Sequence, residues 1–536
     1  MIEWINGFLS AYTGRFFIMQ VLVIACIFVL GVAVTTLLLP KMDSSHAMIF
    51  TMAFPVGLSM FIFVSFIMLI AGVPYKASLI FLFLLVIGLC SLCCAAAHHS
   101  FAAAGISVKR FVLSILLVIV GALIVCSGYF EMSVSNDSLY YFWQYPRAIT
   151  DYEGLRDQFD NFLTDTGIGA AIIGTLPFLF GFGETFGIQS FFNFNFILFF
   201  SNAVFETLGG IRKELSIKKR ICVAVLSGLI IGMCTPVYIL AHWAMANMYF
   251  MEMCFIILYL VFRYSGNYSY GKMTLVGTLL FALSLLRIEG GIFSLLIIAI
   301  TTLLDYRSKD ITAFLIMPSA ILVGIYDIKI FTEYTLDNQV KFLTPGKALI
   351  QFAAFLLMAV YVIVFRRRVN SKFAEKTSLL FAGGLIFVNI VLLLINSGRY
   401  IANLKAFAGN LFGQSGWGIL PYVSIGAAMI ILIWELFISN AGSKRLMELI
   451  DVKKGNSGFW LISSFGFVLI SLAVSWARGD NLDVATGDSG NRVLLQAAPI
   501  LVMMFIVWML ELVFREDGDS DALPDGDSDA LPDAKQ

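Results

Sequence analysis

Long apolar runs alternate with short polar connections along almost the whole chain. Each run can cross, or nearly cross, the roughly 30 Å hydrocarbon core of a bilayer. The runs fall near residues 16–39, 47–72, 78–97, 111–130, 188–210, 221–240, 243–263, 312–332, 347–365, 377–396, 416–439, 458–476 and 493–514. The pattern predicts an all-α polytopic membrane protein with about 13–15 transmembrane helices.

One apolar stretch, residues 273–304, is too long for a single span. Its sequence, MTLVGTLLFALSLLRIEGGIFSLLIIAITTLL, has Arg287, Glu289 and two glycines at its middle. Two helices of about fourteen residues, each about 21 Å long, would form a hairpin with these charges at its tip. This arrangement predicts that the charges lie near the membrane surface rather than at the membrane midplane.

The distribution of Lys and Arg gives an orientation. Basic connections occur at 108–110, 211–220, 306–310, 366–372 and 444–454. If 273–304 is a hairpin, all five lie on one side with most of the 35 Lys and Arg residues, and the positive-inside rule makes that side cytoplasmic. The N-terminus and the loop 131–187 are then outside, and the C-terminus is inside.

Composition agrees with a membrane protein. Of the 536 residues, 60% are hydrophobic and 13% are charged, which excludes a soluble domain, and the zero net charge gives no indication of nucleic-acid binding. All eight cysteines fall in apolar runs, so we interpret them as small hydrophobic residues rather than as disulfides or metal ligands. The first fifteen residues are typical of a short interfacial helix, and the acidic repeat GDSDALPD at 518–533 is typical of a disordered tail.

The loop 131–187 is the longest connection between predicted spans. It opens with SVSNDSLYYFWQYPRAIT, which carries Asp137 soon after a span and is rich in aromatic residues. Residues 151–165 have Leu155, Phe159 and Phe162 at helical spacing, which predicts an amphipathic helix on the membrane surface. Residues 168–183 are apolar but short and broken by Gly and Pro, which favours a shallow segment over a full span.

Polar groups in or beside hydrocarbon are costly unless they face a cavity or a partner, so they are candidates for a functional site. Under this topology, all but one of the candidates lie on the outer side and suggest one outward-facing site; the exception lies mid-span. The candidates are Asp137, Arg147, Glu252, Arg287, Glu289, Arg399, Tyr400 and Arg492. Of these, Glu252 is the mid-span residue, and all except Asp137 are candidates for binding the substrate or donor.

The ordered set of features resembles the GT-C superfamily of integral-membrane glycosyltransferases. An acid, Asp137, stands in the first large outer loop soon after a span, followed by aromatics and an interfacial helix. The segment LLRIEGGIFSLLI is similar to the Arg-Pro-Glu-Gly-type turn of many bacterial members, and MEMCFIILYLVF is similar to their acid-bearing span. The resemblance covers about residues 111–310. The chain departs from it by placing three spans before the span that precedes the loop.

The resemblance implies sugar transfer from a polyprenyl-phosphate-linked donor to a hydroxyl of a cell-surface glycan, lipid or protein. The reaction would invert the anomeric centre on the outer face of a bacterial inner membrane, with Asp137 as the base that takes the acceptor proton. Arg287, Arg399 and Arg492 would stabilise charge on the leaving phosphate, since a guanidinium grips two phosphate oxygens. The loop lacks the Asp-x-Asp pair of metal-dependent relatives. We therefore expect no metal cofactor, although Glu184 or Glu289 would complete a divalent-metal site if they meet Asp137.

The resemblance also implies a division of the chain into four parts. Residues 1–110 form an N-terminal part with an interfacial helix and three extra spans, and residues 111–310 form the catalytic core. Residues 311–514 are C-terminal spans, and residues 515–536 are the tail.

Each candidate residue has a structural alternative. Asp137 would only cap a loop helix, Arg287 would only pair with Glu289, and Glu252 would be a buried protonated carboxyl. The arginines at positions 147, 399 and 492 would be ordinary interfacial residues. Two other functions also stay open: a polymerase or ligase of lipid-linked oligosaccharides, and a transporter.

Overall fold

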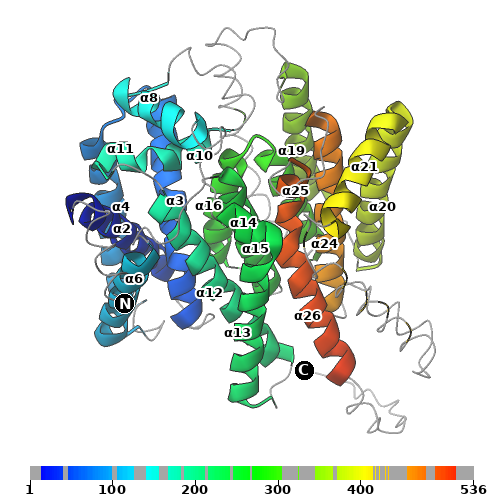
Figure 1. The fold of residues 1–536 in the computed structure, drawn as a ribbon, viewed down its shortest axis with the longest axis horizontal. Coiled ribbons are helices and arrows are strands. Elements are labelled where there is room, and N and C mark those ends of the chain that lie inside the picture. Colours follow the sequence, from blue (N-terminus) through cyan, green and yellow to red (C-terminus); the bar gives the residue numbers. More distant parts are fainter. Residues whose placement is uncertain are drawn as a thin grey trace, which may run out of the picture.

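The computed structural model describes residues 14–39, 46–98, 100, 106–125, 140–155, 167–182, 186–211, 215–241, 245–265, 269–304, 324, 344–365, 371–413, 417, 422, 426, 429, 433, 456–478 and 489–514. Helices make up most of these residues, and no strand occurs among them (Figure 1). Eight of the helices are long and apolar enough to cross a membrane: Ile18–Leu38, His46–Ile70, Ala77–Ala97, Val108–Val125, Gly187–Ile211, Ala246–Tyr264, Gly458–Ala477 and Arg492–Leu510. The chain is therefore an all-α polytopic membrane protein, as predicted.

The first helices are α2 (Gly14–Leu38), α3 (His46–Ile70), α4 (Ala77–Ala97) and α6 (Val108–Val125). Helices α2 and α3 pack backbone to backbone, because each presents a glycine at the crossing. A β-carbon on Gly31 would collide with the carbonyl of Ala53, and one on Gly57 would collide with the carbonyl of Ile27. Small residues that let two backbones approach are a common basis of helix association in membranes.

Four short helices follow in the loop region: the π-helix η1 (Tyr140–Gln144), α8 (Tyr145–Asp151), α10 (Ile168–Gly174) and α11 (Leu176–Phe180). Neither α10 nor α11 is long enough to cross a membrane, which agrees with the shallow segment predicted here. Tyr75, in the turn before α4, holds this region in place. Its hydroxyl lies 2.8 Å from the hydroxyl of Thr175, its N–H donates to the carbonyl of Glu153 at 2.9 Å, and burial raises its pKa to about 12.

The prediction of an amphipathic helix over 151–165 is wrong for its first residues. Helix α8 ends at Asp151, and residues 152–154 form a turn in which Glu153 has a φ of 54°. A left-handed residue of this kind ends a helix, since it cannot continue the right-handed path. The rest of the predicted helix, residues 156–165, lies outside the described residues.

The central helices are α12 (Phe186–Ile211), α13 (Ile217–Met233), α14 (Thr235–Ala241), α15 (Ala246–Tyr264), α16 (Tyr270–Leu286) and α17 (Gly290–Leu304). The single span predicted over 221–240 is two helices, because Pro236 has no N–H to continue α13 but fits the first turn of α14. Helix α15 lies at the centre of the bundle, where it packs against α12, α16 and α17. Nearly all of its side chains are buried.

The hairpin predicted over 273–304 is confirmed: α16 and α17 pack together on either side of the turn 287–289. The tip of the hairpin is buried within the protein. The side chain of Glu289 is fully buried, and that of Arg287 is 12% exposed. The reason is that α10 and α15 both pack against α16 and cover the turn.

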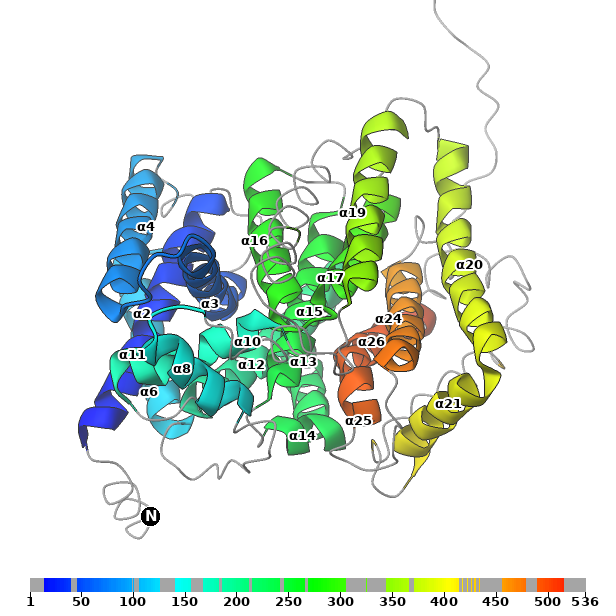
Figure 2. The ribbon, with the colours of Figure 1, turned by 90° about the horizontal axis from the view of Figure 1, so that it is seen from above.

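The last helices are α19 (Pro345–Phe365), α20 (Ser371–Ile395), α21 (Ser397–Phe412), α24 (Asn456–Arg478), α25 (Ser489–Leu494), the 3₁₀-helix η5 (Leu495–Ala497) and α26 (Ala498–Phe514). Figure 2 shows α21 meeting α20 at an angle at the edge of the bundle. Helix α21 was not predicted, because it is amphipathic and gives no apolar run. It buries Asn403 and Phe407 and exposes Ile401 and Leu404.

Several predicted segments fall outside the described residues. They include the span 312–332, apart from one residue, and most of the span 416–439. The N-terminal interfacial helix and the acidic tail 515–536 lie outside as well. The three helices of the predicted N-terminal part pack into the same apolar core as the rest, since α3 contacts both α12 and α16.

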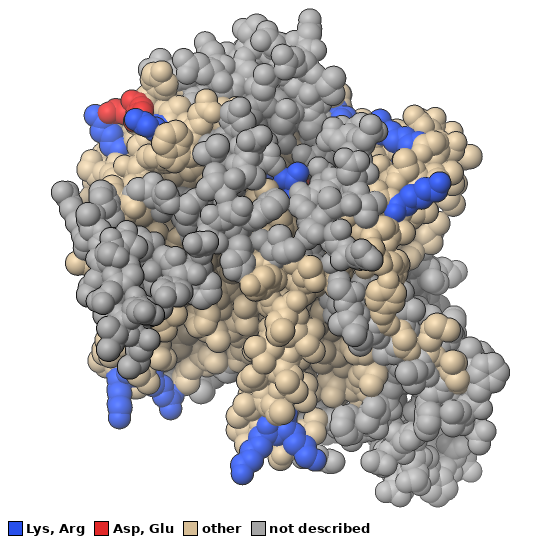
Figure 3. All heavy atoms as spheres, viewed as in Figure 1, with Lys and Arg blue, Asp and Glu red and all other residues tan. Residues whose placement is uncertain are grey.

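The bundle has two distinct ends. At the first, which we call the loop end, the beginning of α10 rests on the turn 287–289 and α8 packs against α10. At the second, the basic end, the described cations are Lys109, Arg110, Lys218, Lys219, Arg220, Arg263 and Lys272. Glu206 is the single carboxylate among the side chains described there. Figure 3 shows Lys and Arg at the lower edge, below α6 and α13, with no described acid beside them.

The glycine crossing of α2 and α3 gives a first prediction. Gly31→Leu should prevent close packing and destabilise the protein by about 1–3 kcal/mol or more. The expected result is a lower melting temperature or aggregation of the purified protein in detergent. Gly384→Leu is the matched control, because Gly384 lies on an exposed face of α20 with open space around it. Equal melting temperatures for the two variants would contradict this packing.

Candidate functional site

The strongest concentration of polar contacts at the loop end is centred on Arg287. Its Nε donates to Oε1 of Glu289 at 2.5 Å, and its Nη1 donates to Oδ1 of Asn247 at 2.6 Å. Arg287 and Glu289 belong to the hairpin turn, whereas Asn247 is in the first turn of α15. The guanidinium is thus held from two sides by different elements.

Asn247 continues the network toward the C-terminal helices. Its Nδ2 donates to the backbone carbonyl of Arg492 in α25 at 3.2 Å. Nη1 of Arg492 lies 3.8 Å from Sδ of Met245, whose own N–H donates to Oε1 of Gln189 in α12 at 3.1 Å. Four elements far apart in the sequence therefore meet at one polar cluster, which we call the arginine site: Gln189, Asn247, Arg287, Glu289 and Arg492.

Glycines allow backbone to approach backbone at the arginine site. Gly167, with a φ of +85°, lies so close to the turn that a β-carbon would be 2.8 Å from the carbonyl carbon of Arg287. A β-carbon on Gly169 would be 2.7 Å from the carbonyl carbon of Leu285. The beginning of α10 therefore rests directly on the hairpin turn. On another side, the amide of Gln351 in α19 fills the space beside Gly291.

Electrostatics at the arginine site favour an anion. A fully buried, ionised Glu289 requires a partner, and Arg287 supplies it. Arg492 adds a second guanidinium, so the described charges of the site, two positive and one negative, sum to +1. Planar guanidinium groups bind phosphate and carboxylate oxygens in pairs. The residue types and their charge suit a phosphate.

Glu252 was grouped with the donor-binding candidates, but no contact joins it to the arginine site. It is fully buried in α15, five residues beyond Asn247, a rise of about 7.5 Å along the helix. Neither of its carboxyl oxygens has a hydrogen-bond partner among the described residues. This placement fits the predicted alternative of a buried, neutral carboxyl at least as well as a binding role.

Asp137, the predicted base, lies outside the described residues. The described chain resumes shortly after it, at η1, where the ring of Phe142 stacks on Tyr249 with centroids 6.3 Å apart. Tyr249 is in the first turns of α15, close along the helix to Asn247. The segment that follows Asp137 therefore packs against the same helix end that carries the arginine site.

Arg399 and Tyr400 form a separate group at the beginning of α21. The Arg399 guanidinium lies over the ring of Trp476 at 5.1 Å, and the Tyr400 hydroxyl donates to Oδ1 of Asn389 at 3.0 Å. Burial raises the pKa of Tyr400 above its ordinary value. Because α21 packs against α25, this group adjoins the element that carries Arg492 without sharing a contact with Arg287.

Arg147 is not brought to the arginine site. It is about half exposed on α8, where it pairs with Asp151 at 3.4 Å and lies over the ring of Trp143 at 5.5 Å. These contacts agree with the alternative in which Arg147 is a surface residue at the membrane interface.

The sequence predicts neither a metal cofactor nor disulfides. Within the described part of the chain, no group of three or more His, Cys, Asp or Glu residues is arranged to hold a metal ion. Asp137 and Glu184 lie outside that part, so the expectation of a metal-independent site stays a prediction. The seven cysteines that the structure describes are free thiols.

Sequence reasoning missed Gln189, Asn247 and Gln351. All three are uncharged and stand among apolar residues, so a search for charges passed over them. A signal was present, since a primary amide in the first or second turn of an apolar helix needs a partner when it is buried. Their meeting point depends on tertiary packing and was not visible in the sequence.

Comparison with family models, with characterised proteins and with solved structures finds no match for this chain. The functional interpretation therefore rests on the arginine site and on the resemblance of the sequence pattern.

Proposed function

We propose that this protein is a membrane glycosyltransferase of the GT-C type. It would transfer a sugar from a polyprenyl-phosphate donor to a hydroxyl of a glycan, lipid or protein acceptor. The single observation that carries the proposal is the arginine site, in which Asn247 links the side chain of Arg287 to the backbone of Arg492. This site lies at the helix end against which the segment after Asp137 packs.

The proposed chemistry divides between an acid–base group and a phosphate clamp. Asp137 takes the proton of the acceptor hydroxyl while the acceptor oxygen bonds to the anomeric carbon. The bond from that carbon to the donor phosphate breaks, and negative charge builds on the phosphate oxygens. Arg287 and Arg492 stabilise this charge, and Asn247 orients Arg287 toward it.

The distribution of charge supports an outward-facing site. Two of the basic connections predicted from the sequence, 108–110 and 211–220, adjoin the beginnings of α6 and α13 at the basic end, opposite the arginine site. The described Lys and Arg side chains divide equally, seven at each end. Applied to the basic connections of the whole sequence, the positive-inside rule makes that end cytoplasmic, so the arginine site would face outward. We propose a bacterial inner membrane as the location, where polyprenyl-linked donors and cell-envelope acceptors meet on the outer side.

A transporter is the second candidate, and Glu252 is the observation that favours it. A fully buried acid within a central helix is typical of proton- or ion-coupled carriers. The arginine site favours the transferase instead, because it lies at a helix end rather than at the middle of the bundle.

Asp137→Asn should lower sugar transfer by at least about 100-fold, because the base is lost while the size and shape of the side chain are kept. The measurement is transfer by the purified protein from a polyprenyl-phosphate sugar, with expression and membrane insertion checked in parallel. An inserted variant with normal turnover would remove Asp137 as the base.

Arg287 cannot be tested by truncation alone, because Arg287→Ala would leave Glu289 charged, buried and unpaired. The double variant Arg287→Met/Glu289→Gln removes both charges and should fold. We expect it to lose donor turnover by about 100- to 1,000-fold, the usual effect of removing one stabilising donor. Asn247→Ala should give a smaller loss, since it only frees the guanidinium to move.

The matched control is Arg147→Ala, which removes an exposed guanidinium at the same end of the bundle and should leave turnover unchanged. Melting temperatures separate loss of fold from loss of function. A folded Arg287→Met/Glu289→Gln variant with unchanged donor kinetics would exclude the phosphate clamp.

A further inference from the structure

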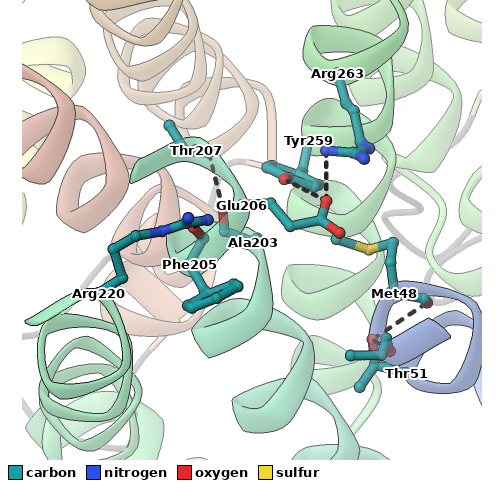
Figure 4. A network of polar contacts seen from close by, with 10 residues as sticks. Met48, Thr51, Ala203, Phe205, Glu206, Thr207, Arg220, Tyr259 and Arg263 are labelled. Atoms are coloured by element: carbon teal, nitrogen blue, oxygen red, sulfur yellow. Dashed lines mark hydrogen bonds and ion pairs between the residues drawn. The ribbon is translucent and has the colours of Figure 1, made fainter. Parts of the chain in front are cut away.

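The basic end carries a second cationic cluster, distant from the arginine site. Lys218, Lys219 and Arg220 occupy the first turn of α13, and the two lysines are exposed. The Arg220 guanidinium packs over the ring of Phe205 in α12 at 4.3 Å, and its Nη2 donates to the Phe205 carbonyl at 3.0 Å (Figure 4). This cluster is held at a fixed place by α12.

The charge of Arg220 is not neutralised by a carboxylate among the described residues. Glu206 is adjacent in sequence to Phe205, but its carboxylate points to the other side of α12, where it pairs with Arg263 at 2.5 Å (Figure 4). Tyr259 also donates to Glu206, at 3.4 Å. The only carboxylate described at this end is thus already bound.

Arg220 also has unused hydrogen-bonding capacity. Its Nε is buried and has no acceptor among the described residues. A buried donor of this kind costs free energy unless a partner, such as an anionic oxygen, completes it. Arg220 thus keeps its charge in the first turn of α13 with one hydrogen bond from Nη2 and none from Nε among the described residues.

An apolar stripe continues from this cluster along α13. Ile221, Val225 and Leu229 follow one another at helical spacing, and each is about half exposed. Lys218 lies on the same face near the beginning of the helix, about two turns before Val225 and three turns before Leu229. A basic group above an exposed apolar stripe matches the shape of a lipid, with its headgroup at the cations and its acyl chains along the helix.

We propose that the beginning of α13 binds an anionic phospholipid of the leaflet at the basic end. The phosphate would accept hydrogen bonds from the exposed ammonium groups of Lys218 and Lys219, beside the charge of Arg220. The acyl chains of the lipid would lie along Ile221, Val225 and Leu229. Basic clusters between helices at the cytoplasmic face commonly bind acidic headgroups. The site is independent of the proposed transferase activity and needs no substrate.

Native mass spectrometry of the full chain, titrated with phosphatidylglycerol or with phosphatidylcholine of the same acyl chains, tests this inference. The unmodified protein should retain phosphatidylglycerol preferentially. Lys218→Gln/Lys219→Gln should weaken that binding by about 25-fold, and the further change Arg220→Gln by about another fivefold, since each cation near an anionic headgroup contributes about a fivefold factor. The exposed lysines make the double variant a sound test even if Arg220→Gln fails to fold.

Lys405→Gln is the control, because Lys405 is an exposed lysine on α21, away from the basic end. It should leave lipid binding unchanged. Equal retention of the two lipids by the unmodified protein, or equal losses in the control and the double variant, would overturn the proposal. Inorganic phosphate should not displace the lipid; displacement at comparable concentration would show a site for free phosphate instead.

Discussion

The ion pair between Arg287 and Glu289 sets the geometry of the loop end. A carboxylate buried as completely as Glu289 is stable only with a cation beside it, and loss of one partner of such a pair costs about 3–5 kcal/mol. The turn between α16 and α17 must therefore present Arg287 inward, toward α15. There Asn247 accepts a hydrogen bond from a second nitrogen of the guanidinium. Asn247 also donates to the backbone carbonyl of Arg492, which connects the turn to α25. The packing of α10 on this turn, through Gly167 and Gly169, depends on the same inward arrangement.

Much of this fold could be predicted from the period and length of the apolar runs. The hairpin followed from a run too long for one span with charges at its centre. The burial of its tip could not be predicted, because it depends on α10 and α15, which lie far from the turn in sequence. Helix α21 was missed for a related reason: half of its face is polar, so no apolar run marks it.

The candidate site was predicted in part. Charge in an apolar context identified Arg287, Glu289 and Arg492, and the structure links these three through Asn247. The same reasoning also selected Arg147, which has a simple surface partner in Asp151. A charge at a membrane interface is compatible with both outcomes, and only tertiary contacts separate them. Uncharged amides such as Asn247 contribute most of the connections and gave the weakest sequence signal.

The most direct test of the proposed function is an experimental structure of the protein with a polyprenyl-phosphate donor bound. We expect the donor phosphate within hydrogen-bond distance of the guanidinium groups of Arg287 and Arg492, and the Asp137 carboxylate facing the anomeric carbon. A donor phosphate bound elsewhere, with Arg287 and Arg492 unchanged and Asp137 far from the sugar, would contradict the assignment of the arginine site to catalysis.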